Sequence, residues 1–130
     1  MKIIELNKIN DPRGNLTFLQ NNEQIPFRIE RTYWLYDVPG GELREGHAFK
    51  KNKEFIIALS GSFDIEIQYE ENCKVYTLNR PYKGLYIPNL KWRRITNFST
   101  NSVALIVSST KFDTNDYIKN LETLKKLTFE

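Results

Sequence analysis

Short segments of alternating apolar and polar residues constrain the fold of this chain more than any other feature of its sequence. In residues 63–69 the odd positions are apolar and the even positions are polar. Successive side chains of a β-strand point to opposite faces, so this pattern predicts a strand with one face on a core and the other in water. Comparable segments, separated by Gly, Pro and Asn, recur at residues 28–37, 53–59, 74–78, 84–87 and 102–108. Such spacing predicts an antiparallel sandwich or barrel.

The C-terminal segment has a different period. Apolar side chains recur there at spacings of three and four, at Tyr117, Ile118, Leu121, Leu124 and Leu127. This predicts one amphipathic helix, which Asp113 or Thr114 would cap and which would cover an open end of the barrel. Strands followed by one terminal helix indicate an all-β fold with a helical appendage, and a length of 130 residues suits a single domain over residues 1–130.

Composition and charge limit the partners that we expect. The net charge is only +3, and the basic residues are dispersed except at residues 50–53 and 91–94, so a small anionic ligand fits better than nucleic acid or a membrane surface. No stretch approaches the roughly 18 apolar residues that span a bilayer, and residues 1–5 lack the apolar run of a signal peptide, so we expect a cytoplasmic protein. The one cysteine, Cys73, excludes an internal disulfide and a cysteine-based metal cluster.

Two motifs narrow the fold further. From Gly41 to Gly61 the spacing is that of the first cupin motif, G-x5-H-x-H-x4-E-x6-G, with His47 and Glu54 in place and Phe49 at the second histidine. Residues 88–97 match the second cupin motif, P-x-G-x2-H-x3-N, at its proline and asparagine, with Leu90 for the glycine and Arg93 for the histidine. The chain therefore resembles the cupin superfamily, and the resemblance implies a jelly-roll β-barrel with a central pocket.

The two replaced histidines bear on metal binding. A cupin metal site normally uses three histidines and a glutamate, and neutral imidazole is a ligand that first-row metals favour. Phe49 cannot ligate, and Arg93 carries a permanent positive charge that repels a cation. His47 and Glu54 alone supply too few ligands, so we predict a site with no metal and no cofactor.

His47 is the only histidine in the chain, and strand alternation places it on the same face as Phe49, toward the barrel interior. Imidazole accepts and returns protons near neutral pH, which is what proton transfer at a carbon beside a carbonyl requires. A lone histidine can instead be purely structural, but the position in the motif favours a functional role.

Cationic and aromatic residues in or beside the predicted strands are candidates for binding. Guanidinium groups bind diphosphates through paired hydrogen bonds, and the candidates are Arg13, Arg31, Arg44 and Arg93. Tyr33 could donate a hydrogen bond to a sugar oxygen or an enolate, and Trp92 could stack on a base or a sugar. Each of these residues could equally be an ordinary surface or core side chain.

Several short motifs in a fixed order suggest a more specific family. They are Asp11-x-Arg13-Gly14, Arg31-x-Tyr33-Trp34, residues 44–50, Leu59-x-Gly61-Ser62, Trp92, Asn97-Phe98-Ser99 and Asp116-Tyr117-Ile118. Together they resemble the dTDP-sugar 3,4-ketoisomerases over nearly the whole chain. The resemblance implies a domain-swapped homodimer that converts dTDP-4-keto-6-deoxyglucose into its 3-keto isomer for amino-sugar synthesis.

The same resemblance implies roles for individual residues. His47, Tyr33 and Arg44 would be catalytic, and the substrate-binding residues would be Arg13, Arg31, Lys50, Trp92 and Arg93. Family members usually read H-A-H-K where this chain has His47-Ala48-Phe49-Lys50, so one of two histidines that face the sugar is missing. The loss leaves the configuration at C4 of the product open, because that configuration depends on the face from which the proton is delivered.

Two other functions fit the same residues. A dTDP-sugar 3,5-epimerase would also be a metal-free cupin with a histidine base, but it would remove a different proton. A non-catalytic sugar-nucleotide-binding cupin is the second alternative, since Phe49 could mark a lost activity. Carbonyl migration to C3 would indicate the isomerase, deuterium incorporation at C5 the epimerase, and binding without turnover the non-catalytic module.

Overall fold

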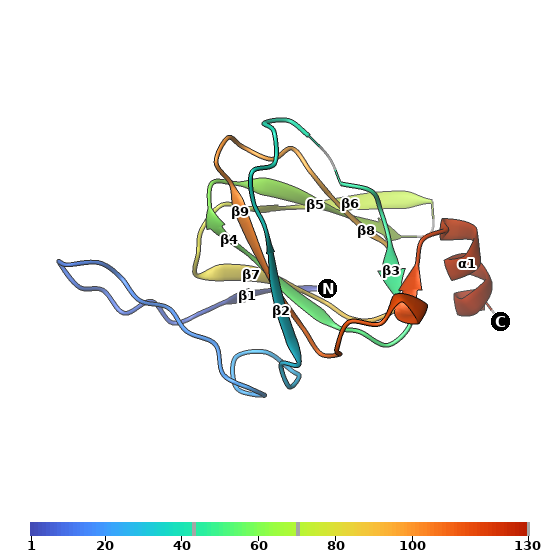
Figure 1. The fold of residues 1–130 in the computed structure, drawn as a ribbon, viewed down its shortest axis with the longest axis horizontal. Coiled ribbons are helices and arrows are strands. Elements are labelled where there is room, and N and C mark those ends of the chain that lie inside the picture. The colour runs from blue at the N-terminus through green and yellow to red at the C-terminus, as the bar shows by residue number, and fades with distance from the viewer. Residues whose placement is uncertain (43, 70, 130) are drawn as a thin grey trace.

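The computed structural model describes residues 1–42, 44–69 and 71–129, so Leu43, Glu70 and Glu130 lie outside the described residues. The chain is built from β-strands and ends in one α-helix, which confirms the predicted fold class (Figure 1). The strands are β1 (Lys2–Glu5), β2 (Arg31–Leu35), β3 (Ala48–Phe49), β4 (Glu54–Ser60), β5 (Phe63–Tyr69), β6 (Asn72–Leu78), β7 (Lys83–Ile87), β8 (Arg93–Thr96), β9 (Val103–Ser108) and β10 (Tyr117–Ile118). A 3₁₀ turn, η1 (Thr114–Asp116), precedes β10, and the helix is α1 (Leu121–Phe129).

The strands form two main antiparallel sheets. The larger has the order β1-β7-β4-β9-β2 and the smaller has the order β6-β5-β8, while β3 and β10 pair separately. Figure 1 shows the smaller sheet lying across the larger one. The main core fills the space between them with side chains from both sheets, including Ile56, Ile65, Ile95 and Ile106, each at most 7% exposed.

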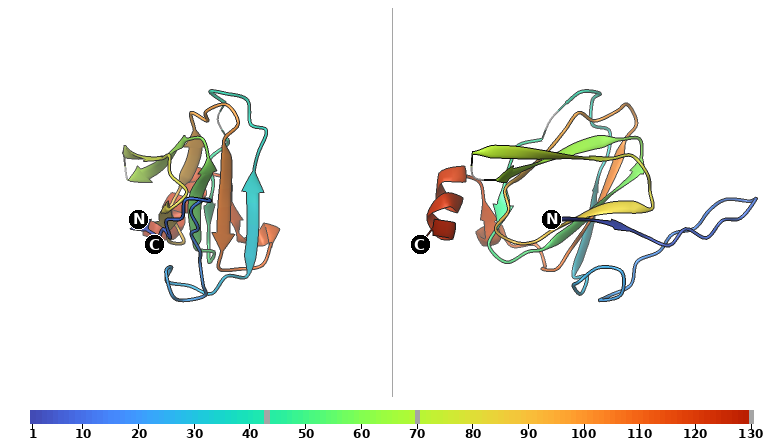
Figure 2. Two further views of the ribbon diagram at one scale, coloured as in Figure 1. Left: turned by 90° about the vertical axis from the view of Figure 1, so that its left-hand side faces the viewer. Right: turned by 180° about the vertical axis from the view of Figure 1, so that it is seen from behind.

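Strand β4 is buried on both of its faces. Glu54, Ile56 and Ala58 face the space between the sheets, while Phe55 and Ile57 face outward and are also buried. The outward pair packs with Leu6, Ile25 and Phe27 of the N-terminal segment, so this segment covers part of the outer face of the larger sheet. Beyond this contact, the chain between β1 and β2 extends as an arm away from the barrel (Figures 1 and 2).

The predicted strands agree with the structure in position. Residues 63–69 form β5 with the bounds that the alternation predicted, and β4, β6, β7 and β9 lie within two residues of their predicted bounds. The segment predicted at residues 28–37 forms a strand only at β2. The short strands β1, β8 and β10 were not predicted, because so few residues carry little alternation, whereas β3 lies within the strand expected at His47 and Phe49.

The predicted start of the C-terminal helix is wrong. Asp113 caps the short η1 turn, its side chain accepting a hydrogen bond from the Asn115 backbone N–H, and Tyr117 and Ile118 then form strand β10 against β3. The helix begins at Leu121, where the Asn120 side chain accepts from the Glu122 N–H at 2.8 Å. Pairing with a strand almost 70 residues earlier in the chain overrides the local helical period.

The helix packs beside the β3–β10 pair. Leu124 of α1 forms a small cluster with Ala48 and Ile118, and Trp92 packs against that cluster. The helix therefore packs against the β3–β10 pair and stabilises the position of β3, which directly follows His47 in the chain. Among the described residues, no helix is both long enough and apolar enough to cross a membrane.

Close packing at Gly84 gives a test of this fold. A Cβ atom at Gly84 would overlap the Phe55 ring and lie 2.7 Å from the Ile56 carbonyl oxygen. We expect Gly84→Ala to lower the free energy of unfolding by about 2 kcal/mol through overpacking, measured by chemical denaturation. Cys73→Ala, at an exposed position of β6, should change it by less than about 0.5 kcal/mol. Equal stability of Gly84→Ala and the unsubstituted protein would contradict this packing.

Candidate active site

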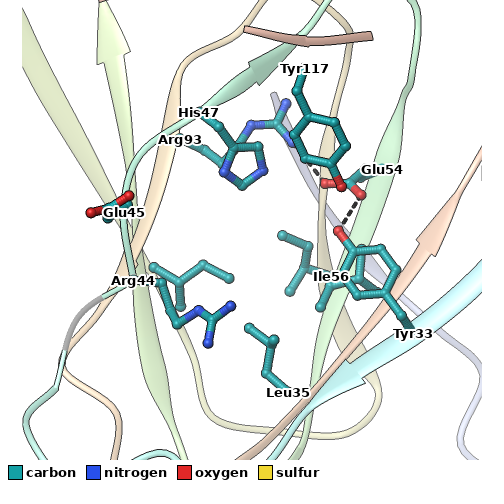
Figure 3. A pocket seen from close by; sticks show the side chains of 11 residues that line it. Tyr33, Leu35, Arg44, Glu45, His47, Glu54, Ile56, Arg93 and Tyr117 are labelled. Atoms are coloured by element: carbon teal, nitrogen blue, oxygen red, sulfur yellow. Dashed lines mark hydrogen bonds and ion pairs between the residues drawn. The ribbon is translucent and has the colours of Figure 1, made fainter. Parts of the chain in front are cut away.

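A cavity of about 490 Å³ lies between the two sheets. Strands of the larger sheet, strand β8 of the smaller sheet, β10 and the segment before β3 all contribute to its walls. Its lining residues are Tyr33, Leu35, Arg44, Glu45, His47, Glu54, Ile56, Arg93, Ile95, Ile106 and Tyr117 (Figure 3). Polar and charged side chains thus share the cavity with aliphatic ones, as in many small-molecule sites.

His47 enters the cavity from the segment that precedes β3. Its backbone N–H donates to the Arg93 carbonyl at 3.0 Å, and the Arg93 N–H donates to the His47 carbonyl at 2.9 Å. Burial is the main cause that lowers the pKa of His47 to about 4, and the positive charge of Arg93 is the next. The imidazole is therefore neutral near pH 7, which is the form that accepts a proton.

The ring of Phe49 touches that of His47, with centroids 5.1 Å apart. Phe49 itself is fully buried and is absent from the cavity lining. It packs against Tyr117 on one side and lies 5.1 Å from the Arg93 guanidinium carbon on another. Phe49 therefore packs against His47, Tyr117 and Arg93 without itself lining the cavity.

Glu54 connects the polar residues on the other side of the cavity. One carboxylate oxygen, Oε1, accepts a hydrogen bond from Arg93 Nη1 at 2.9 Å, and both residues of this ion pair are about 1% exposed. The other oxygen, Oε2, accepts from the Tyr33 hydroxyl at 2.6 Å and from Ser108 Oγ at 2.8 Å. The carboxylate is held by three donors from strands β2, β8 and β9.

Tyr33 is kept in its protonated form by these surroundings. Burial is the main cause that raises its pKa far above the ordinary value for tyrosine, and the negative charge of Glu54 adds to it. The hydroxyl hydrogen points to Glu54, so the lone pairs of the Tyr33 oxygen can accept a second hydrogen bond. Figure 3 shows Tyr33 on the opposite side of the cavity from His47 and Arg44.

The structure brings four of the eight residues named from the sequence into this cavity: Tyr33, Arg44, His47 and Arg93. Arg93 is fully buried and engaged by Glu54, whereas the guanidinium of Arg44 forms no ion pair or hydrogen bond within the described residues. Among the described residues, Arg44 is thus a cation without a side-chain partner in the cavity wall. A ligand oxygen could pair with it directly.

The other four residues lie outside the cavity lining. Arg13 pairs with Asp11 on the arm and is 90% exposed, and Lys50 lies in an open groove beside Lys51 and Lys111. Arg31 lies behind Tyr33, 5.3 Å from the centre of its ring. Trp92 packs toward Gly46 and the helix instead of into the cavity. Their assignment to substrate binding stays a prediction.

Two functional candidates were missed from the sequence. Glu54 was considered only as a metal ligand, although its place in the first motif marked it as a pocket residue. Tyr117 lines the cavity and lies 5.7 Å, centre to centre, from the His47 ring. It was assigned to the helix, and nothing in the local sequence shows that β10 pairs with β3.

The residues at the metal positions of the motifs are engaged with one another. Arg93 donates to Glu54 and stacks on Phe49, so a guanidinium takes the place where the motif would position a metal-binding imidazole. In the ranges 1–42, 44–69 and 71–129, no three His, Cys, Asp or Glu side chains gather as a metal site. A reaction without metal or cofactor stays a prediction.

Comparison with known proteins gives a consistent result. The sequence model of the family described as "FdtA: WxcM-like, C-terminal" matches residues 1–128. A TDP-4-oxo-6-deoxy-α-D-glucose-3,4-oxoisomerase of Aneurinibacillus thermoaerophilus is 34% identical over 125 residues, which cover 96% of this chain and 90% of that protein.

Two solved structures are also similar over nearly their whole length. An H→N mutant of the 3,4-ketoisomerase QdtA from Thermoanaerobacterium thermosaccharolyticum, in complex with TDP-4-keto-6-deoxyglucose, is 32% identical with a TM-score of 0.93, covering 97% of this chain and 91% of that chain. The TDP-quinovose 3,4-ketoisomerase WlaRB from Campylobacter jejuni is 38% identical with a TM-score of 0.91, covering 96% of each chain.

The epimerase alternative has weaker support. A 4-keto-6-deoxy sugar epimerase of Streptomyces spheroides, NovW, shares the fold with a TM-score of 0.74 but is only 14% identical to this chain. That similarity concerns the fold alone.

The lowered pKa of His47 can be tested directly, because His47 gives the only imidazole signals of tag-free protein. We expect its NMR chemical shifts to titrate with a midpoint of about 4 in the folded state, and near the ordinary value of about 6.5 in urea. Because the folded-state pKa lies below the unfolded value, His47 should reduce the free energy of unfolding as the pH falls from about 6.5 through 4. A folded-state midpoint at or above the value in urea would contradict the assignment.

Proposed function

Because this chain belongs to the family described as "FdtA: WxcM-like, C-terminal", we propose that it converts TDP-4-keto-6-deoxyglucose into the TDP-linked 3-keto isomer. The chain is an isomerase of the sugar-nucleotide 3,4-ketoisomerase type, like its curated relative and the two solved structures. The substrate is the one that the names of those relatives carry. The observation that carries the proposal is a neutral imidazole, His47, facing a polar cavity in a chain of this family.

His47 starts the reaction as the general base. Its neutral ring removes the proton from C3 of the sugar, which the neighbouring C4 carbonyl makes acidic, and an enediolate forms. The proton then returns at C4 from the protonated His47 or a nearby group, and the carbonyl is left at C3. The lowered pKa of His47 favours release of the proton to carbon and opposes its uptake, because a stronger imidazolium acid is a weaker imidazole base.

Arg44 and Tyr33 stabilise the enediolate. Arg44 has no competing partner among the described residues, so its guanidinium can pair with the developing negative charge on oxygen. Tyr33, across the cavity, donates its only hydroxyl hydrogen to Glu54, so its oxygen can accept a hydrogen bond from the hydroxyl on the second oxygen of the enediolate. Groups that are already in position when charge develops lower the barrier most effectively.

The nucleotide part of the substrate extends beyond this cavity. Lys50 lies in a groove of about 810 Å³ together with Lys51 and Lys111, and the Nε of Arg31 is buried with no partner among the described residues. These cations are our candidates for the diphosphate, because paired donors suit phosphate oxygens. Trp92 is retained as a candidate for stacking, on the outer side of the segment that carries His47.

The assembly that we propose is a domain-swapped homodimer. The outer face of the larger sheet is apolar, with Leu59 46% and Trp34 57% exposed, and a hollow of about 670 Å³ separates it from the arm. A second copy would cover this face, as obligate dimer interfaces resemble a divided core. The arm, which includes the exposed pair of Arg13 and Asp11, extends away from its own barrel (Figure 2), so in the dimer it would contact the partner. The cytoplasmic location and the role in amino-sugar synthesis stay predictions.

The base assignment is tested with His47→Asn. We expect the unsubstituted protein to move the carbonyl of TDP-4-keto-6-deoxyglucose to C3 in deuterated water, with deuterium entering only at C3 or C4. The variant should lose at least about 100-fold in both conversion and exchange, because a positioned acid–base group contributes that much or more. The measurement is NMR of the sugar protons, with a chelator present throughout.

Each other outcome excludes either the proposed reaction or the assigned base. Deuterium at C5 with the carbonyl retained at C4 would indicate a 3,5-epimerase. Tight binding with neither exchange nor conversion would indicate a non-catalytic binding protein. Full turnover by His47→Asn would exclude His47 as the base.

The dimer is tested by light scattering after gel filtration. We expect the mass of two chains for the unsubstituted protein and a shift toward one chain for Leu59→Lys, which places a charge on the apolar outer face. Val75→Lys is the matched control, because Val75 is 53% exposed but lies on β6 of the other sheet. A monomeric unsubstituted protein, or equal effects of the two lysines, would contradict the proposed interface.

A further inference from the structure

The proposed reaction must move two protons, and His47 accounts for only one of them. Between substrate and product, one hydrogen moves from C3 to C4 and another moves from the oxygen on C3 to the oxygen on C4. The resemblance noted above implies a second histidine at the position of Phe49, and the phenyl ring there cannot exchange a proton. Another group of this chain can carry the oxygen-bound proton.

The hydroxyl of Tyr33 and the carboxylate of Glu54 are placed for that transfer. Both line the cavity, and their oxygens are 2.6 Å apart. Figure 3 shows Tyr33 across the cavity from His47, with Glu54 hydrogen-bonded to both Tyr33 and Arg93, so the Tyr33 hydroxyl can reach the oxygens of a sugar whose carbon atoms face the imidazole. The Tyr33 hydroxyl donates its hydrogen to Glu54, so the lone pairs of the Tyr33 oxygen can accept a hydrogen bond from a ligand.

We propose that Glu54 is a positioning residue that acts through Tyr33, and this inference rests on the proposed function. Glu54 accepts the Tyr33 hydroxyl proton while the Tyr33 oxygen takes the proton from the sugar O3. In this step the O3–H bond and the original Tyr33 O–H bond break, while a new Tyr33 O–H bond and a Glu54 O–H bond form. The reverse transfer delivers a proton to the sugar O4. Tyr33 and Glu54 thus return to their starting states.

The surroundings of the pair support this transfer. Arg93 and Ser108 donate to the two oxygens of Glu54 and hold the carboxylate in a fixed orientation toward Tyr33. Glu54 is 1% exposed, so bulk water does not compete for its proton. A free tyrosinate beside this carboxylate would be strongly disfavoured, which the raised pKa of Tyr33 reflects. Moving both protons together avoids that species.

The experiment separates exchange at carbon from completion of the isomerisation. Exchange of the C3 hydrogen in deuterated water needs only His47, whereas formation of the 3-keto product also needs the oxygen-bound proton to move. We expect Glu54→Gln to keep the exchange within about tenfold and to lower product formation by at least about 100-fold. NMR measures both rates in the same sample. A parallel fall of both rates, or unchanged product formation, would overturn the role of Glu54.

Two further variants control for folding. Glu54→Asp keeps a charge for Arg93 but shortens the side chain by one methylene. It should therefore also keep the exchange rate and lower the rate of product formation, and it provides the test if Glu54→Gln does not fold. Val75→Ala is the control for a neutral substitution, because Val75 is exposed on β6 away from the cavity, and it should change both rates by less than about threefold. An Asp variant that does not separate the two rates would also overturn the inference.

The outcomes distinguish this inference from the proposed function. If the unsubstituted protein fails to form the 3-keto product, the proposed function itself is wrong. If it forms the product and both Glu54 variants match it, only the role of Glu54 is wrong.

Discussion

The buried ion pair between Arg93 and Glu54 is the interaction on which the cavity depends. It joins β8 of the smaller sheet to β4 of the larger sheet, with a distance of 2.9 Å between Nη1 and Oε1 and almost no exposure of either side chain. Removing one partner would leave a buried unpaired charge at a cost of about 3–5 kcal/mol. The guanidinium also helps to lower the pKa of His47, and the carboxylate orients Tyr33. Together with burial, this one contact therefore influences the protonation of both His47 and Tyr33.

The sequence predicts the fold where the pattern is local and long enough. Residues 63–69 alternate without exception, and β5 has the predicted bounds because one face packs in the core and the other lies in water. The C-terminal segment shows the opposite case. Tyr117 and Ile118 fit a helical period, yet they pair with Phe49 and Ala48 of a distant strand. Pairing between distant segments depends on tertiary packing, so it cannot be predicted from the pattern of seven consecutive residues.

The site was predictable to the extent that the motifs fix positions in a strand. His47, Arg93 and Glu54 follow from spacing, and all three line the cavity. The use of Glu54 was not predictable, because a carboxylate serves equally as a metal ligand or as a partner for Arg93 and Tyr33 until distances are known. Arg13 and Trp92 were named for their chemical type and for the family motifs that contain them, and neither criterion says where a side chain lies. Both lie outside the cavity lining, and their roles in binding stay predictions.

Phe49 explains why the polar groups are divided between two sides of the cavity. A histidine at that position would place a second titratable ring about 5 Å from His47, where two imidazoles would affect each other's protonation. The phenyl ring removes that coupling and packs beneath Arg93, so it helps to keep the guanidinium in contact with Glu54. In the proposed mechanism His47 transfers the carbon-bound proton, whereas the Tyr33 hydroxyl and the Glu54 carboxylate, 2.6 Å apart, transfer the oxygen-bound one. The residue that departs from the family pattern thus fits the proposed separation of the two proton transfers.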